Sequence, residues 1–214
     1  MIRLRTLLVS RPTSISDDQG EWVSGFAKQP VAGPVELRSD NLDGDGQADR
    51  TVHGGPEKAL LGYCADHYPL WSSELGQPFA DGAFGENLAL TGLSEEAVAI
   101  GDTFHIGTAV IQVSQPRQPC WKLARRNHRP DLPAKAITSG RLGWYFRVLT
   151  AGVVTAGDTL ETLARPHAEW TIARINRLFF GPAAAAGSLL SEAALLPAMS
   201  PEFTPVCKRR LGVA

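Results

Sequence analysis

Cysteine is scarce in this sequence of 214 residues, and its three cysteines, Cys64, Cys120 and Cys207, lie far apart. No two of them have the spacing of a zinc-binding pair, and together they provide no disulfide framework. We therefore expect a protein of the reducing cytoplasm, without a structural zinc site or an iron–sulfur cluster of its own.

An excess of charge of either sign is also lacking. Lysine and arginine number 21 against 22 aspartate and glutamate, so the formal net charge is −1. Nucleic-acid binding relies on a basic surface, and we expect no such partner. The apolar run at residues 7–9 is too short for a signal peptide, and no stretch approaches a membrane span. The 43% hydrophobic and 20% charged residues suit an ordinary globular domain with a small appendage.

The clearest chemical signal lies around Cys120. Residues 110–114 alternate as a β-strand does, and a loop with two prolines then ends that strand. Trp121–Arg126 is predicted to be a helix, whose N-terminus, with Arg117 and Lys122 nearby, would favour a thiolate. A buried structural cysteine is the alternative. A cysteine hydrolase would need a neighbouring histidine and acid, and the sequence identifies none.

A second signal is the run 53–58, His-Gly-Gly-Pro-Glu-Lys, in which two glycines lead into an expected helix. Glycines let an anion approach the backbone N–H groups, and Lys58 adds a positive charge. A simple tight turn is the alternative. The acidic run 43–49 resembles a calcium loop, but its glycine is misplaced for an EF-hand and the final glutamate is missing. We interpret it as a polar turn.

The remaining pattern is mainly that of short strands. Before residue 56 the predicted strands are residues 3–10, Val35–Leu37 and 51–53. Residues 57–74 have apolar side chains at helical spacing and are predicted to form one helix. Residues 83–163 are predicted to be mostly β, interrupted by a helix at Leu132–Ser139.

The composition changes after residue 165, so we divide the chain into a first domain, residues 1–165, and a small helical extension, residues 166–214. Residues 170–180 form an amphipathic pattern with one apolar face, and residues 189–199 are a candidate second helix. Pro205 falls inside the third helix that would follow. We therefore expect this extension to be reduced or loosely packed.

Four runs, in this order, resemble the motifs of MOSC domains: residues 49–59, 84–88, 114–123 and 140–147. The resemblance covers about residues 20–165, and the tail is similar to the three-helix extension of free-standing members of the YiiM type. The resemblance to MOSC domains implies a mixed, mainly β fold. Its architecture would be a MOSC-type β-barrel with inserted helices plus a small C-terminal helical domain.

The resemblance also implies a molybdenum cofactor, molybdopterin, with Cys120 as a thiolate ligand to the metal. A soft thiolate suits such a metal. The implied activity is that of an oxidoreductase that removes oxygen from N-hydroxylated compounds, such as hydroxylaminopurines, a detoxification reaction. A cofactor or sulfur carrier without turnover is the alternative. Reduction consumes two electrons, and the sequence has no dinucleotide-binding glycine motif, so we expect a separate flavin or iron–sulfur reductase as partner.

The positions that match the family motifs provide the expected site. Cys120 and His53 are expected to be catalytic, Cys120 as the metal ligand and His53 as a proton-transfer group. Glu86 and Trp144 are expected to line the substrate space. The residues expected to bind the cofactor through backbone N–H groups, amides or cationic side chains are Gly54, Gly55, Lys58, Asn87, Arg117, Lys122 and Arg141.

Overall fold

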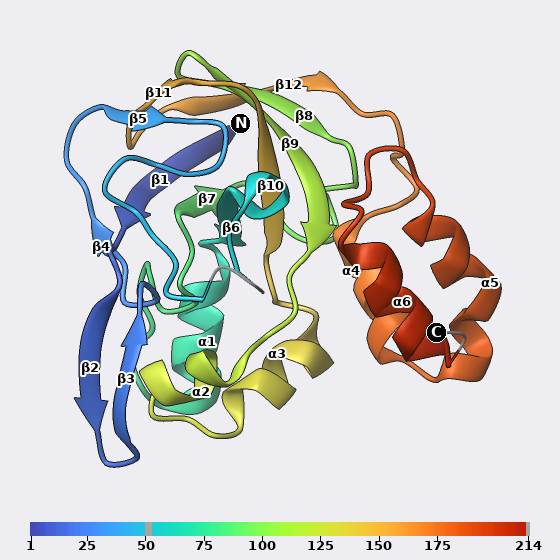
Figure 1. Cartoon of the computed structure of the whole chain (residues 1–214), viewed down its shortest axis with the longest axis horizontal. Helices are drawn as coiled ribbons and strands as arrows, with labels where there is room; N and C mark the ends of the chain where they lie inside the picture. Colours follow the sequence, from blue (N-terminus) through green and yellow to red (C-terminus); the bar gives the residue numbers. More distant parts are fainter. Residues whose placement is uncertain (50–52, 213–214) are drawn as a thin grey trace.

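A closed β-barrel forms the body of the molecule, whose computed structural model describes residues 1–49 and 53–212 (Figure 1). The strands of its sheet are β1 (Ile2–Val9), β4 (Gln29–Pro30), β6 (Leu60–Cys64), β7 (Leu88–Thr91), β8 (Thr103–Ile106), β9 (Ala109–Pro116), β10 (Trp144–Thr150) and β12 (Thr159–Ala164). They follow the order β12-β8-β9-β10-β6-β7-β1, and pairing of β12 with β1 closes the barrel. β6 and β7 run parallel, and β4 extends the sheet beside β1.

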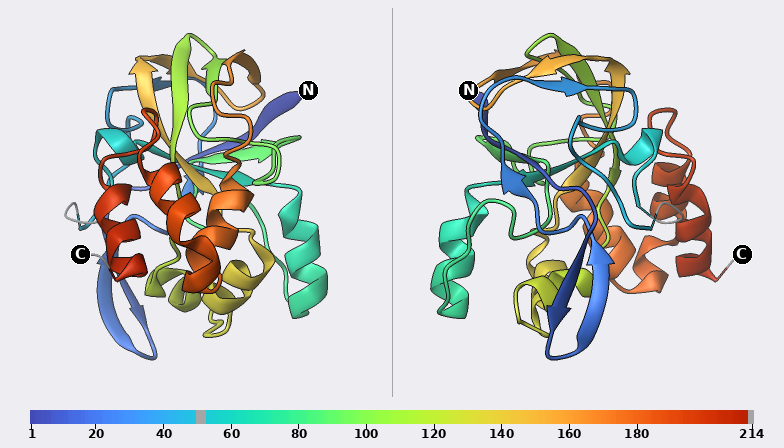
Figure 2. Two further views of the ribbon diagram at one scale, coloured as in Figure 1. Left: turned by 90° about the vertical axis from the view of Figure 1, so that its right-hand side faces the viewer. Right: turned by 60° about the vertical axis from the view of Figure 1, so that its left-hand side comes forward.

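Two ribbons and several helices are attached to this barrel. β5 (Val35–Leu37) pairs with β11 (Gly152–Val154), and β2 (Thr13–Asp17) with β3 (Gly20–Ser24) in a projecting hairpin. The helices are η1 (Pro56–Lys58), α1 (His67–Leu75), α2 (Trp121–Arg126), α3 (Leu132–Ser139), α4 (Ile172–Phe180), α5 (Ala183–Ala194) and α6 (Phe203–Leu211). α4, α5 and α6 stand together on one side of the barrel (Figure 2). None of the helices described is long and apolar enough to cross a membrane.

The end of β9 is bent by a bulge that matters for the site. Val113 pairs with Phe146 and Gln115 pairs with Tyr145, so Ser114 is an extra residue between the two pairs. Such a bulge turns the strand and redirects the side chains that follow it. The Ser114 hydroxyl donates a hydrogen bond to the Glu57 carbonyl oxygen at 2.6 Å, which joins β9 to η1.

Several local predictions are confirmed. The helices Trp121–Arg126 and Leu132–Ser139 and the strand Val35–Leu37 have the predicted bounds, and the regular elements of the segment 83–163 are mainly strands. Of the strand predicted at 51–53, residues 51 and 52 lie outside the described residues.

The single helix predicted over residues 57–74 is wrong. Its first half is η1 followed by the strand β6, and only α1 is helical. Every residue of β6 is buried, because Leu60 on one face packs in the barrel core and Tyr63 on the other packs with Trp71 and Phe84. A continuous apolar run has no period that separates a buried strand from a buried helix. Gly62 fits the strand closely, since a Cβ atom there would lie 2.7 Å from Cε2 of Phe146.

The expectation of a reduced or loose tail is also corrected. α4, α5 and α6 are all formed, and Phe203 and Cys207 on α6 are buried. Pro205 is tolerated because it lies in the first turn of α6, where backbone N–H groups have no partner within the helix. The apolar core continues from barrel residues such as Phe104 to tail residues such as Ile175. The division at residue 165 stays a prediction.

Candidate functional site

A pocket opens where β9 ends and the chain turns into α2. The segment after β3, the loop 46–48, the turn before η1 and the segment 85–87 form its other walls. Of the residues expected in the site, those that line the pocket are His53, Gly54, Lys58, Asn87, Arg117, Cys120 and Lys122. The structure therefore brings together most of the expected site from three separate stretches of the chain.

Cys120 lies half-buried at the start of α2, in an extended conformation with φ −113°. Its carbonyl oxygen accepts a hydrogen bond from the Leu123 N–H at 3.1 Å, which begins the helix. The thiol side chain has no capping hydrogen bond to the helix. Cys64 and Cys207 are buried in the apolar interior. Cys120 is thus the cysteine that the fold presents to a ligand.

Two cations beside Cys120 are buried, and no counter-ion for them is found among residues 1–49 and 53–212. Arg117 is 3% exposed and Lys122 is 9% exposed. Arg117 donates a hydrogen bond to the Leu142 carbonyl oxygen at 3.3 Å, and neither residue pairs with a carboxylate in the described part of the chain. Burial of an unpaired charge is costly, so an anion that enters this pocket gains a strong attraction.

The positive charges around Cys120 also affect the pKa of His53. Burial lowers the pKa of its imidazole, and the charges of Lys122, Lys58 and Arg117 lower it further, while Asp49 opposes them. The imidazole is therefore neutral at neutral pH, so that one ring nitrogen can donate a hydrogen bond and the other can accept one.

Gly54 and Gly55 both adopt positive φ angles, +77° and +84°. The positive φ favours glycine at position 54, where a Cβ atom would also lie 2.6 Å from Oε1 of Gln47. Gly55 does not line the pocket but caps η1, where it turns the chain. Lys58 is held nearby by an ion pair with Glu202, 2.6 Å away, at the start of α6.

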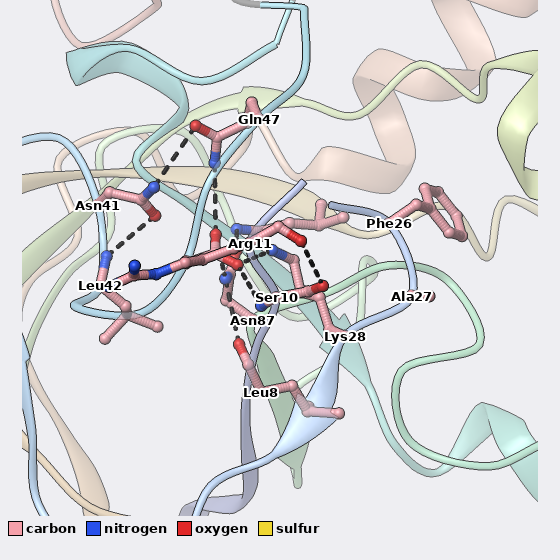
Figure 3. Close-up of polar contacts among 12 residues, drawn as sticks. Leu8, Ser10, Arg11, Phe26, Ala27, Lys28, Asn41, Leu42, Gln47 and Asn87 are labelled. Carbon is pink, nitrogen blue, oxygen red and sulfur yellow. Dashed lines mark hydrogen bonds and ion pairs between the residues drawn. The ribbon is translucent and has the colours of Figure 1, made fainter. Parts of the chain in front are cut away.

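Asn87 lies in the pocket wall with its amide already engaged (Figure 3). Its Oδ1 accepts from the Leu61 N–H at 3.1 Å, and its Nδ2 donates to the Leu8 carbonyl oxygen at 3.2 Å and to Asp45 Oδ2 at 3.0 Å. Asn87 thus joins the strands β1 and β6 to the 41–47 loop. Asn87 also lines the pocket, so its expected contact with the cofactor stays a prediction.

The sequence did not reveal the buried pair of Lys28, which itself lines the pocket, and Asp45. Lys28 forms an ion pair with Asp45, whose carboxylate also accepts from the Ser10 N–H at 2.8 Å and from Gln47 Nε2 at 3.3 Å. Burial lowers the pKa of Lys28, and Asp45 opposes that change. The acidic run 43–49 therefore has a structural function, because Asp45 fixes the loop that carries Gln47 into the pocket.

Glu86 does not reach the pocket. Its fully buried carboxylate accepts from the Phe84 N–H at 3.1 Å and also contacts the Gly82 N–H and the Tyr68 hydroxyl. Burial raises the pKa of Glu86, and the bond from Tyr68 opposes the rise. The expected substrate contact is corrected, since these bonds hold the 82–86 turn.

Trp144 and Arg141 are also placed elsewhere. Trp144 is fully buried in the barrel core, its ring centroid 6.1 Å from that of Phe146. Arg141 pairs with Glu74 at 2.6 Å and stacks on Trp71, whose ring centroid is 4.4 Å from its guanidinium carbon. Neither the expected substrate wall nor the expected phosphate contact is formed by these two residues.

Tyr145, which the sequence did not single out, takes the place expected for Trp144. Successive side chains of a strand point to opposite faces, so Trp144 points into the core and Tyr145 lies in the pocket. Burial raises the pKa of Tyr145, and the charge of Arg117 opposes the rise. Its hydroxyl is therefore protonated at neutral pH and can donate a hydrogen bond.

Comparison with known proteins places the chain in a family. Residues 49–161 match the model of the MOSC domain, and the chain belongs to the MOSC domain family, whose members are associated with the molybdenum cofactor. The chain is 41% identical over 211 residues to the uncharacterized protein YflK of Bacillus subtilis, covering 97% of this chain and 96% of that one.

Two further similarities bear on function. A protein of Gibberella moniliformis named reductase is 39% identical over 200 residues, which are 91% of this chain but 35% of the fungal protein. The crystal structure of YiiM from Geobacillus stearothermophilus superposes with a TM-score of 0.81 at 36% identity, covering 99% of this chain and all of that one. The barrel with its helical tail is therefore the fold of a free-standing, YiiM-type MOSC protein.

Proposed function

We propose that this protein is a molybdenum-cofactor-dependent reductase of N-hydroxylated compounds, such as hydroxylaminopurines. The observation that carries the proposal is the pair of buried cations, Arg117 and Lys122, which have no carboxylate partner among the described residues and lie beside the half-buried thiol of Cys120. A cationic pocket suits a phosphorylated pterin, and a thiolate suits molybdenum. The similarity to a protein named reductase supports the direction of the reaction.

The chain's own residues would bind and orient the cofactor. Cys120 would bind the metal, Arg117 and Lys122 would hold the phosphate, and the glycine at position 54 would allow close approach of the ligand. When bound, the cofactor supplies a two-electron redox centre for oxygen transfer.

The net reaction is R–NH–OH plus two electrons and two protons, which yields R–NH2 and water. The neutral imidazole of His53 would take a proton from solvent and deliver it to the leaving oxygen of the N–OH group. Tyr145 would donate a hydrogen bond to the same group. We propose that a separate flavin or iron–sulfur reductase supplies the electrons.

The test is to purify the protein from a host that makes the molybdenum cofactor and to measure its molybdenum and pterin contents. The loaded protein is then mixed with 6-hydroxylaminopurine and chemically reduced methyl viologen, which replaces the electron-donor protein. We expect adenine to form, and no turnover with NADH or NADPH alone. Transfer of the cofactor to an acceptor protein without formation of adenine would indicate a carrier and contradict the proposal.

A further inference from the structure

The position of Arg117 in the pocket depends on a turn that lies behind it, residues 140–143. Arg117 Nη1 donates a hydrogen bond to the Leu142 carbonyl oxygen at 3.3 Å. The Arg117 N–H donates to the Gly143 carbonyl oxygen, also at 3.3 Å. Both the backbone and the guanidinium of Arg117 are thus held by the turn 140–143.

This turn needs support from other segments, because a glycine stands at each of its ends. Gly140 and Gly143 have positive φ angles of +74° and +82°. Glycine leaves the backbone free to adopt many conformations, so the turn gains little rigidity from its own residues. On one side Gly143 packs on β6, where a Cβ atom would lie 2.5 Å from the Gly62 carbonyl oxygen. A hydrogen bond from outside the turn must fix the direction of its peptide groups.

Glu95 provides that hydrogen bond. Its Oε1 accepts from the Gly143 N–H at 2.8 Å, and its Oε2 lies 2.8 Å from Nε2 of His67. The Glu95 carbonyl oxygen accepts from the Ala173 N–H of α4 at 2.9 Å. Both the backbone and the carboxylate of Glu95 are therefore fixed, and the turn is tied to a rigid group.

The N–H of Gly143 and the carbonyl of Leu142 belong to one peptide group. Glu95 accepts a hydrogen bond from one end of this group, and Arg117 donates a hydrogen bond to the other end. A carboxylate at the N–H and a guanidinium at the carbonyl polarise the peptide in the same direction, and hydrogen bonds in such a chain strengthen one another where water is excluded. Glu95 and Arg117 are each 3% exposed. The charge of Glu95 therefore acts on Arg117 through a single peptide.

We propose that Glu95 is a positioning residue for the cofactor pocket, which holds the Leu142–Gly143 peptide and thereby directs the guanidinium of Arg117 toward a bound phosphate. Glu95 is not among the described residues that line the pocket, and it borders a separate hollow between α3 and α4. Its effect on an anion therefore passes through Arg117. The inference rests on the proposed function only in assigning the cofactor phosphate to Arg117.

The test is a double-mutant cycle in the cofactor-free protein, with inorganic phosphate as the ligand and titration calorimetry as the measurement. Glu95→Ala should weaken phosphate binding about fivefold, because the guanidinium that donates to the anion is less well oriented. In the Arg117→Met background, Glu95→Ala should change the affinity less than about twofold, because the residue through which it acts is gone. Glu95→Gln keeps an acceptor for the Gly143 N–H and should bind phosphate within about twofold of wild type.

Two further variants separate positioning from general damage. Glu96→Ala is the matched control, because Glu96 is the next residue and its exposed side chain pairs with Arg177 on α4 at 2.7 Å. Glu96→Ala should bind phosphate as wild type does. Glu95→Asp keeps the charge but shortens the side chain by one methylene, so it should weaken phosphate binding with less disturbance of the fold. It is carried through the same cycle with Arg117→Met.

Three results would overturn the inference: no binding of phosphate to wild type, wild-type affinity in both Glu95→Ala and Glu95→Asp, or an equal loss of affinity with and without Arg117. Phosphate binding that depends on Glu95, in a protein that does not reduce 6-hydroxylaminopurine, would support the positioning role and contradict the proposed function.

Discussion

The unpaired guanidinium of Arg117 predicts an unusual response to mutation. In the cofactor-free protein it is buried with one hydrogen bond, to the Leu142 carbonyl oxygen, and lies over the Phe26 ring at 6.0 Å. Arg117→Met keeps an unbranched side chain of similar length against Phe26 and removes the charge. We expect the cofactor-free variant to be more stable than wild type.

The magnitude follows from two opposing effects. Burial of an uncompensated charge costs several kcal/mol in real proteins, whereas a hydrogen bond from a charged group contributes about 1.5 to 3 kcal/mol. The difference predicts a gain on the order of 1–2 kcal/mol in the free energy of unfolding. The same substitution should weaken binding of inorganic phosphate by roughly tenfold, because one charged donor is lost.

The assay is urea unfolding of the cofactor-free protein, with Arg125→Met as the matched control. Arg125 makes two hydrogen bonds of 2.5 Å to the Asp17 carboxylate, so its loss should lower stability without affecting phosphate binding. We predict that the free energy of unfolding rises in Arg117→Met and falls in Arg125→Met. A loss of stability in Arg117→Met comparable to that in Arg125→Met would refute the reasoning.

Two further predictions concern the scaffold. Burial alone would lower the pKa of His67, but hydrogen bonds with Cys64 and with Glu95 (2.8 Å) raise it to about 9. Protonated His67 therefore stabilises the fold by roughly 3 kcal/mol, fully below pH 6.5 and no longer once the pH has risen through about 9. Urea unfolding between pH 6 and 10 should show this loss of stability in wild type. The variant His67→Gln should not show it. Gly62→Ala should lower the melting temperature, at a cost of about 1–3 kcal/mol in stability, because its Cβ would meet Phe146. Gly187→Ala on α5 should raise the melting temperature slightly, because a Cβ there would have nothing within 4 Å. Equal melting temperatures for the two alanine variants would contradict the packing argument.

The sequence was sufficient where local signals decide the structure. The sequence predicts the bounds of the short helix after Cys120, because the prolines before it end the preceding strand. The strand β6 was missed because burial on both faces removes any alternation. That burial depends on residues distant in the chain, such as Phe146 in the barrel core and Leu142 in the outer cluster, and no local pattern contains them.

The sequence predicts which segments form the candidate site, but it predicts less well which residues of those segments line the pocket. Arg117, Cys120 and Lys122 lie together because one loop carries them. Trp144 and Tyr145 are neighbours, and only the register of β10 decides which of them faces the pocket. Glu86 and Asn87 are predicted to contact ligands, but their polar atoms already have partners. Those of Glu86 are its own turn and Tyr68, and those of Asn87 include Leu61 and Asp45. Such partners are set by the tertiary fold.

The central claim is that Cys120 binds molybdenum through its sulfur. The most direct measurement is the molybdenum X-ray absorption spectrum of the cofactor-loaded wild type and of Cys120→Ser, with Cys64→Ala and Cys207→Ala as controls at the two buried cysteines. We predict that Cys120→Ser retains the pterin but has one sulfur fewer at the metal and turnover lower by orders of magnitude, while both controls match wild type. An unchanged sulfur coordination and normal turnover in Cys120→Ser would contradict the account.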